Sequence, residues 1–276
     1  MASPAPDERR SPTPAAVHKR EAIRRLKEAM QAGRFVLHYQ PIVSARDGRV
    51  ASVESLLRWR TSDEEQDPVS ELLHSVERSP VIFKLENWAL EHALQAARKW
   101  IDAGLTGLRV AVNLSAREFP RADLVRRVRH RLSAAGLPPS ALALEITESS
   151  SMSDFGAAKD RLERLAGMGI DLWLDDFGTG YSSLEWLSHL PTHGLKIPGT
   201  FVKRLFTEPR CQVIVKRAIE LAHDLGLRVV AEEVETREQR DFLTASGCDL
   251  FQGFLFHAAL PAKELAAALA RDVARP

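Results

Sequence analysis

An alternation of strand-like and helical segments constrains the fold of this chain more than any other feature. Eight runs rich in apolar residues have the length and composition of β-strands: residues 35–43, 50–59, 108–115, 142–147, 170–176, 194–197, 228–234 and 249–256. Segments of helical character lie between most of them or after the last, at 82–103, 121–135, 155–168, 183–189, 208–225, 236–246 and 262–271. Eight strands that alternate mostly with helices predict a (β/α)8 barrel.

The first two strands depart from this alternation. Only residues 44–49 separate them, and Asp47-Gly48 within this connection is a turn signal. A parallel crossover needs about a dozen residues or more, so we expect an antiparallel hairpin here. The predicted fold is therefore an α/β protein, a modified TIM (β/α)8 barrel with an antiparallel first strand. A doubly wound open sheet is the alternative, but no glycine pattern of a dinucleotide site or P-loop follows any strand.

The N-terminal residues differ in composition from the rest of the chain. Residues 1–17 are rich in proline, small and charged residues, so we expect a disordered tail. Residues 18–32 place Ile23, Leu26 and Met30 at helical spacing before Gly33, which predicts a basic amphipathic helix. We expect this helix to cover one end of the core, within a barrel domain that spans residues 18–276.

Charge and cysteine content limit the classes of partner and compartment. The formal net charge is +1 and the pI is about 7.9, below the value of about 9 that is typical of nucleic-acid-binding domains, so we expect no DNA partner. Cys211 and Cys248 show no zinc spacing, which fits a reducing cytoplasm. No apolar run approaches the roughly 18 residues of a membrane span, and the first residues lack the apolar core of a signal peptide. We predict a cytoplasmic protein.

Polar side chains recur in the C-terminal half of the predicted strands or just beyond. They are Glu54, Arg58, Asn113, Glu145, Thr147, Glu148, Asp175, Asp176, Lys196, Glu232, Glu235 and Gln252. Any one of them is compatible with a solvated rim, and the adjacent Asp175 and Asp176 alone fit a turn before a helix that Ser182 caps. Because the C-terminal ends of parallel barrel strands meet at one mouth, where barrel active sites lie, we expect the whole set to converge there.

So many carboxylates in one mouth require a counter-charge. The donors are carboxylate and amide oxygens, with no cysteine or histidine, which favours Mg²⁺ or Mn²⁺ over zinc. The number of carboxylates exceeds the need of one ion and predicts two, an arrangement suited to phosphodiester cleavage. An aldolase-like or enolase-like barrel with a single Mg²⁺ and a barrel with a structural ion remain alternatives.

Seven short motifs resemble, in the same order, those of EAL domains, which are bacterial phosphodiesterases that act on cyclic di-GMP. They are ESLLRW (54–59), NLS (113–115), EITE (145–148), DDFGTGYSSL (175–184), LKI (195–197), AEEVET (231–236) and QGFLF (252–256), and YQPI (39–42) is similar to the family's opening strand. The resemblance covers nearly all of the predicted barrel. It implies hydrolysis of one phosphodiester of cyclic di-GMP, which yields linear pGpG.

The resemblance also implies roles for individual residues. The resemblance implies that one metal ion is held by Glu54, Asn113, Glu145 and Asp175, and that Asp175 is shared between two ions. Asp176 and Glu232 correspond to residues that serve the second ion and the nucleophilic water, one of them as general base. Lys196 corresponds to the cation that holds this water or stabilises charge on the phosphate.

Further positions are similar to the substrate and supporting residues of the family. The resemblance implies that Arg58 contacts a substrate phosphate and that Gln40 and Gln252 line the nucleotide site. Glu148 is similar to the residue that anchors the loop after the paired aspartates, and Glu235 to one that supports the mouth. Dimerisation in the family implies a homodimer through that loop and its following helix. No regulatory domain is recognisable before the barrel, so we expect control by a partner protein, by expression or by a segment outside this chain.

The chain differs from the family pattern at four sites. Ser55 replaces an alanine in the tripeptide that names the family, and Pro198 replaces an aspartate, which removes a carboxylate and a backbone donor. Glu233 replaces a glycine beside a predicted ligand, and Ala258-Ala259 replaces an Arg-Pro pair. The alternatives to an active enzyme are therefore a catalytically weak or inactive cyclic di-GMP receptor and a protein-interaction module.

Overall fold

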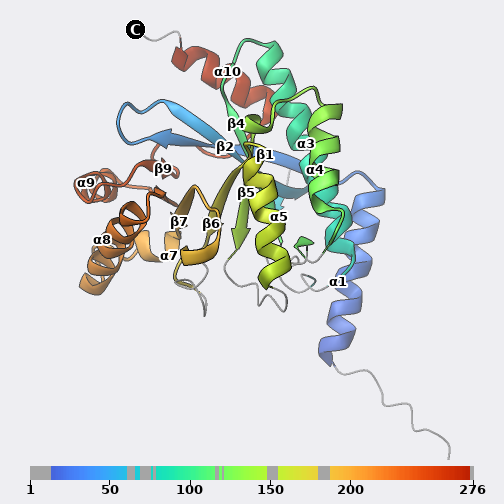
Figure 1. The fold of residues 1–276 in the computed structure, drawn as a ribbon, viewed down its shortest axis with the longest axis horizontal. Coiled ribbons are helices and arrows are strands. Elements are labelled where there is room, and N and C mark those ends of the chain that lie inside the picture. Colours follow the sequence, from blue (N-terminus) through green and yellow to red (C-terminus); the bar gives the residue numbers. More distant parts are fainter. Residues whose placement is uncertain are drawn as a thin grey trace, which may run out of the picture. The chain divides into compact units, whose positions relative to one another are not determined.

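Two compact units make up the protein. The structure, a computed structural model, describes residues 14–60, 66–68, 76, 79–115, 118–119, 121–147, 155–179 and 187–273. One unit comprises Met1–Val36 and Arg58–Leu85, and the other comprises Leu37–Leu57 and Glu86–Pro276. The second unit contains the barrel (Figure 1).

Eight strands close the barrel in the described part of the chain. They are β1 (Phe35–Ser44), β2 (Val50–Arg60), β4 (Arg109–Leu114), β5 (Leu142–Thr147), β6 (Asp171–Asp175), β7 (Gly194–Ile197), β8 (Arg228–Ala231) and β9 (Leu250–Gln252). From β2 to β9 each strand pairs in parallel with the next, whereas β1 is antiparallel to β9 and also pairs with β2, which closes the ring. The predicted modified TIM barrel is confirmed.

The hairpin between β1 and β2 has the geometry that its sequence predicts. The Ser44 amide donates to the Arg49 carbonyl at 2.8 Å, and the Gly48 amide donates to the Ser44 carbonyl at 2.9 Å. Asp47 Oδ1 accepts from the Arg49 amide at 3.1 Å, which is an Asx turn. Gly48 has φ of 70°, a left-handed conformation that glycine adopts without steric cost.

Helices pack around the outside of the barrel (Figure 1). They are α3 (Val81–Asp102), α4 (Leu124–Ala134), α5 (Phe155–Gly167), α7 (Gly199–Val202), α8 (Pro209–Asp224), α9 (Arg237–Ala245) and α10 (Ala262–Val273), with the 3-10 turn η2 (Pro139–Ala141) and the short strand β10 (Leu260–Pro261). Their amphipathic spacing explains this arrangement, since α8 buries Val215, Ala218, Ile219 and Ala222 along one stripe. Among the described helices, none combines the length and the apolar character needed to cross a bilayer.

The inside of the barrel is filled by side chains from six strands. Ile42, Ala111, Ala143, Trp173, Val230 and Leu250 form one buried cluster. Trp173 is the largest of them, and a methyl group on Gly194 would overlap its ring. Glycine at 194 therefore makes room for the indole, so that β7 can pair closely with β6.

An ion-pair cluster closes the barrel at the end where the parallel strands begin. Asp171, the first residue of β6, pairs with Arg109 and, at 3.0 Å, with Arg228, and these arginines are the first residues of β4 and β8. The Arg228 guanidinium also lies 5.0 Å from the centre of the Trp173 ring. Asp171 is only 8% exposed, and its two partners supply the charge that its burial requires.

The first unit contains α1 (Pro14–Gln31) and β3 (Gln66–Pro68). Strand β3 pairs antiparallel with the end of β2, where Arg58 is opposite Pro68. The Arg25 guanidinium lies 5.0 Å from the centre of the Trp59 ring. Helix α1 covers the predicted helix as far as Gln31 and begins at Pro14, within the predicted tail, and the rest of that tail is outside the described residues.

The last two barrel strands are shorter than their sequences predict. Strand β8 ends at Ala231 and β9 at Gln252, whereas extended structure was expected to residues 234 and 256. The two segments beyond them pack against each other, since the Val234 amide donates to the Gln252 carbonyl at 2.9 Å and the Leu255 amide donates to the Val234 carbonyl at 3.0 Å. A side chain on Gly253 would overlap the Val234 backbone. These contacts turn both segments out of the sheet at the barrel mouth.

Candidate functional site

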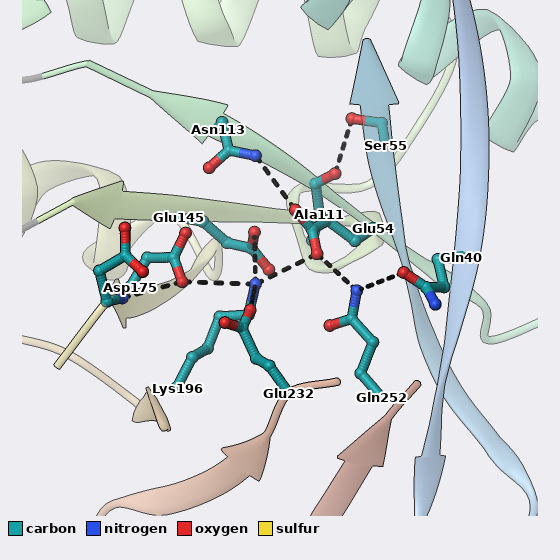
Figure 2. Close-up of polar contacts among 11 residues, drawn as sticks. Gln40, Glu54, Ser55, Ala111, Asn113, Glu145, Asp175, Lys196, Glu232 and Gln252 are labelled. Carbon is teal, nitrogen blue, oxygen red and sulfur yellow. Dashed lines mark hydrogen bonds and ion pairs between the residues drawn. The ribbon is translucent and has the colours of Figure 1, made fainter. Parts of the chain in front are cut away.

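A ring of polar side chains lies at the C-terminal ends of the parallel strands (Figure 2). Its members are Glu54 on β2, Asn113 on β4, Glu145 on β5, Asp175 at the end of β6, Lys196 on β7, Glu232 directly after β8 and Gln252 at the end of β9. Glu54 lies midway along β2 and the other members lie in or just after the C-terminal half of their strands, so the parallel arrangement brings residues that are far apart in the sequence together. The structure brings these seven residues together at one mouth.

Lys196 lies at the centre of the ring (Figure 2). Its Nζ is 2.6 Å from Glu232 Oε1, 3.1 Å from Glu145 Oε2, 3.2 Å from Glu54 Oε2 and 3.5 Å from Asp175 Oδ1. The side chain is 1% exposed. One ammonium group therefore faces four carboxylates, and the cluster retains an excess of negative charge that can attract further cations.

Amide side chains complete the hydrogen bonding of Glu54. Asn113 Nδ2 donates to Glu54 Oε1 at 3.2 Å, and Gln252 Nε2 donates to Glu54 Oε2 at 2.7 Å. Gln252 Nε2 also donates to Gln40 Oε1 at 3.1 Å, and Gln40 Nε2 donates to the His257 carbonyl at 3.1 Å. This chain of amides connects β1 and the segment after β9 to the acidic ring.

Burial and mutual repulsion change the acidity of these groups in different directions. Burial raises the pKa of Glu145 well above its ordinary value, and the nearby Glu54 adds to this effect. Burial also raises the pKa of Glu232 to about 8, although Lys196 opposes the shift. Burial alone would lower the pKa of Lys196, but the surrounding carboxylates outweigh it and raise the pKa well above 10.5. Lys196 therefore stays protonated, whereas Glu145 and Glu232 bind protons more readily than ordinary carboxylates.

Asp176 places a further carboxylate beside the ring. One oxygen each from Asp175, Asp176 and Glu232 lies within 4.8 Å of the others. Asp176 has φ of 55°, an uncommon conformation in which aspartate is among the better tolerated residues. The Asp176 carbonyl accepts from the Thr179 amide at 3.2 Å and from its hydroxyl at 2.8 Å. This tight turn directs the side chains of two adjacent aspartates toward one region, as a divalent cation would require.

The structure gives no position relative to the ring for two predicted site residues and places a third, Glu235, outside it. Glu148 lies outside the described residues. Arg58 belongs to the first unit, and its position is described there, opposite Pro68. Glu235 is exposed, its amide donates to Gln239 Oε1 at 2.8 Å, and its carboxylate is 4.0 Å from Lys203 Nζ. The structure thus places Glu235 beside the segment that carries Glu232 and not among the acids.

The sites that differ from the family pattern fit the fold. The Ser55 hydroxyl donates to the Ala111 carbonyl at 2.8 Å, so the extra polar group has a partner in the core. Pro198 has φ of −68° and ψ of 150° and precedes the short helix α7, where proline is well tolerated. Its carbonyl accepts from the Phe201 amide at 3.0 Å. Ala258 is exposed.

A partly buried acidic residue, Glu86, is not marked by any motif of the sequence. Glu86 on α3 accepts a hydrogen bond from the Ser115 amide at 3.0 Å, directly after β4. Burial raises the pKa of Glu86 to about 7, and Glu118, itself 1% exposed and paired with Arg127, adds to the shift. In the sequence Glu86 looks like a surface position of an amphipathic helix, and only the neighbouring leucines at 85 and 90 indicate that this turn is buried.

Comparison with known proteins places this fold and site in a family. Residues 23–259 match the EAL domain family. The chain is 41% identical over 245 residues to the bifunctional diguanylate cyclase/cyclic di-GMP phosphodiesterase MucR of Pseudomonas aeruginosa, an alignment that covers 89% of this chain and 36% of MucR. It is 40% identical over 236 residues to the cyclic di-GMP phosphodiesterase NbdA of the same species, with 86% of this chain and 30% of NbdA covered. The chain thus spans about a third of the length of these curated relatives.

Solved structures agree with this relationship. The phosphodiesterase of PaMucR in complex with c-di-GMP superposes with a TM-score of 0.83 at 40% identity, and the superposition covers 89% of this chain and 99% of that one. The EAL enzyme Bd1971 in its form bound to cAMP and cyclic di-GMP superposes with a TM-score of 0.87 at 27% identity, with 93% and 70% covered. The modified barrel, the acidic ring at its mouth and these similarities together show that the chain belongs to the EAL domain family.

Proposed function

We propose that this protein is a Mg²⁺- or Mn²⁺-dependent phosphodiesterase that hydrolyses one phosphodiester bond of cyclic di-GMP to give linear pGpG. The observation that carries the proposal is the ring itself, in which four carboxylates surround Lys196 at 2.6 to 3.5 Å. Relatives at about 40% identity are named as cyclic di-GMP phosphodiesterases. A receptor without catalysis has no chemical need for so many converging acids.

The residues present fit a pair of hard divalent cations. Their donor atoms are carboxylate and amide oxygens, the ligand type that Mg²⁺ and Mn²⁺ prefer. In our proposal Glu54, Asn113, Glu145 and Asp175 would hold one ion. Asp175, Asp176 and Glu232, whose oxygens lie within 4.8 Å of one another, would hold the second. When bound, such ions lower the pKa of water and neutralise charge on the phosphodiester.

The protein's own groups position the water and move its proton. Glu232 is the proposed general base, because its carboxylate lies 2.6 Å from Lys196 Nζ and belongs to the acidic group that would hold the second ion. Asp176 is the alternative base, since its carboxylate belongs to the same acidic group. Lys196 remains a cation and holds the attacking water or stabilises the charge that develops on the phosphate. Its burial makes this interaction stronger than it would be in water.

Substrate contacts are proposed for three residues. Gln40 and Gln252, joined by a hydrogen bond of 3.1 Å, have amide groups that suit recognition of a guanine edge or a ribose hydroxyl. Arg58 is proposed to bind a phosphate, because a guanidinium forms two parallel hydrogen bonds with it. Glu148 and Glu235 are proposed to support the loop after Asp176 and the mouth, without contact to the reacting atoms.

One incubation separates the proposed function from its alternatives. The purified protein is mixed with cyclic di-GMP and either Mg²⁺ or Mn²⁺, and the products are separated by liquid chromatography, with a parallel sample in EDTA. Formation of pGpG that depends on the metal supports the phosphodiesterase. Tight binding without product would instead indicate a receptor, and absence of both would indicate an interaction module.

The proposal extends to assembly and control. We propose a homodimer through the loop and helix that follow Asp176, which lie largely outside the described residues. Such a contact would couple the partner's position to the two aspartates at the end of β6, and a regulatory protein or domain could act there. Light scattering at several protein concentrations, with and without cyclic di-GMP, tests the dimer, and a monomer under all conditions would contradict it.

A further inference from the structure

The segment after β8 is attached to the end of β7 and to the segment after β7 through consecutive contacts. The Glu232 amide donates to the Ile197 carbonyl at 3.0 Å, and the Glu232 carboxylate pairs with Lys196 at 2.6 Å. One residue further along, the Glu233 carboxylate forms an ion pair with Lys203. The contacts thus begin with the Lys196–Glu232 pair in the acidic ring and end with the Glu233–Lys203 pair.

Glu233 has a backbone conformation that its side chain disfavours. Its φ is 52°, and among the described residues Asp176 is the only other non-glycine residue with positive φ. Such a conformation is unfavourable for an L-residue with an unbranched long side chain. It persists where surrounding contacts fix the backbone on both sides. Here the Glu232 amide is held by Ile197, and the Val234 amide donates to the Gln252 carbonyl at 2.9 Å.

The Glu233 side chain supplies contacts that offset this strain. Its carboxyl group lies against Gly199, the first residue of α7, where an added methyl group would overlap it. Lys203, directly after α7, pairs with this carboxylate. Both side chains are about half exposed, 52% for Glu233 and 53% for Lys203. The ion pair alone is therefore weak, and its importance lies in the backbone turn that it accompanies.

We propose that Glu233 is a positioning residue, which together with Lys203 holds the left-handed turn after Glu232 and thereby directs the Glu232 carboxylate into the acidic ring. Glu233 acts through the backbone and touches neither substrate nor metal. The inference rests on the proposed function, because a displaced Glu232 carboxylate would weaken the binding of a divalent cation. It predicts that cation binding by Glu232 depends more on the backbone preference of the residue at 233 than on its charge.

A series of substitutions at 233 separates these two properties. Glu233→Gly removes the carboxylate and also the penalty for positive φ, and Glu233→Asn retains a side chain that tolerates this conformation. Glu233→Ala and Glu233→Gln keep the penalty but lose the charge. We expect the Gly and Asn variants to stay within about twofold of the parent in the Mn²⁺ concentration for half-maximal activity. The Ala and Gln variants should require about three- to tenfold more Mn²⁺, because they keep the unfavourable φ at residue 233 but lose the ion pair that offsets its cost.

Lys203 provides an independent test through a double-mutant cycle. Lys203→Met should raise the Mn²⁺ requirement about two- to threefold in the parent and leave it unchanged in the Glu233→Gly background, since glycine needs no offsetting contact. Arg204→Met is the matched control, because Arg204 follows Lys203 and also contacts α7, through the Thr200 carbonyl at 2.7 Å, but its carboxylate partner is Glu208 at 3.4 Å and not Glu233. It should leave the requirement unchanged in both backgrounds.

Calorimetric titration with Mn²⁺ alone gives the same comparison without turnover. If the parent binds Mn²⁺, and Gly, Asn, Ala and Gln at 233 all give the same affinity, the positioning role is wrong while the proposed function stands. If the parent neither binds Mn²⁺ nor forms pGpG, the proposed function is wrong, and the positioning role with it. Weaker binding in the Ala and Gln variants, with unchanged binding in the Gly and Asn variants, is the result that supports the inference.

Discussion

Lys196 Nζ lies 2.6 Å from Glu232 Oε1, at the centre of a ring that contains three more carboxylates within 3.5 Å of the same nitrogen. This relationship explains how a barrel mouth can keep several acids close together before any cation binds. The buried ammonium offsets part of their repulsion, while the remaining negative charge is available to ligand binding.

Replacement of this central cation should therefore destabilise the protein. Lys196→Met leaves Glu54 and Glu145 buried without an opposite charge, and loss of one partner of a buried pair typically costs about 3–5 kcal/mol. We expect a lower melting temperature in EDTA and partial recovery with Mn²⁺, which replaces the missing charge. Thermal denaturation with and without Mn²⁺ measures both effects. A variant as stable as the parent in EDTA would show that Lys196 is not the counter-charge.

Removal of one proposed metal ligand should abolish turnover. Glu54→Ala and Asp175→Ala each remove a carboxylate from the ring, and we expect pGpG formation to fall by about a thousandfold or more, on the scale of losing an essential electrostatic contribution to catalysis. Glu91→Ala is the control, since Glu91 is exposed on α3 and pairs with Arg131 at 2.5 Å. Undiminished product from either ring variant would overturn the site assignment.

The ion-pair cluster at the other end of the barrel should affect stability and leave the chemistry intact. Asp171→Ala removes the shared partner of Arg109 and Arg228, and the loss of charged hydrogen bonds of this kind costs about 2–3 kcal/mol. We expect a melting temperature lower by several degrees and a kcat within about twofold of the parent at a temperature where both proteins are folded. A large fall in kcat without a fall in stability would contradict this separation.

Glu86 predicts a dependence of stability on pH. Its pKa rises from 4.5 to about 7 on folding because the side chain is buried. The protonated form is thus favoured in the folded state. The contribution to stability is fully present below pH 4.5 and is lost as pH rises through about 7, with a magnitude of up to about 3 kcal/mol.

Glu86→Gln tests this assignment, because the amide oxygen can still accept from the Ser115 amide but cannot ionise. We expect the unfolding free energy of the parent to fall relative to that of the variant between pH 5 and pH 8, as measured by denaturant titration. Glu91→Gln, an exposed substitution on the same helix, should leave the pH profile of the parent unchanged. Parallel profiles for the parent and Glu86→Gln would show that Glu86 ionises normally.

The barrel and most of its site could be predicted because they depend on local patterns. Each strand is an apolar run, and residues such as Glu145 and Lys196 interrupt it near the end that parallel packing turns toward one mouth. The short connection before β2 predicted the reversed first strand for a simple geometric reason. Ring membership thus follows from strand direction, without knowledge of side-chain contacts.

The features that could not be predicted depend on contacts between distant segments. Residues 252–256 have strong β propensity, but close approach of Gly253 to the Val234 backbone ends the strand at Gln252. The left-handed turn at Glu233 and its pairing with Lys203 likewise arise only when the segments after β7 and β8 meet. Tertiary packing overrides local preference at these positions.

The reversed first strand has a practical consequence for protein engineering. Because β1 is antiparallel to β9, the hairpin at Asp47 and Gly48 lies at the end of the barrel where the parallel strands begin, and the Ala45 amide donates to the Asp249 carbonyl at 2.9 Å just before β9. Exposed hairpin tips of this kind accept added sequence well. An affinity tag or fluorescent reporter inserted between these two residues would stand a full strand length from the acidic ring, which makes this hairpin the attachment point of choice.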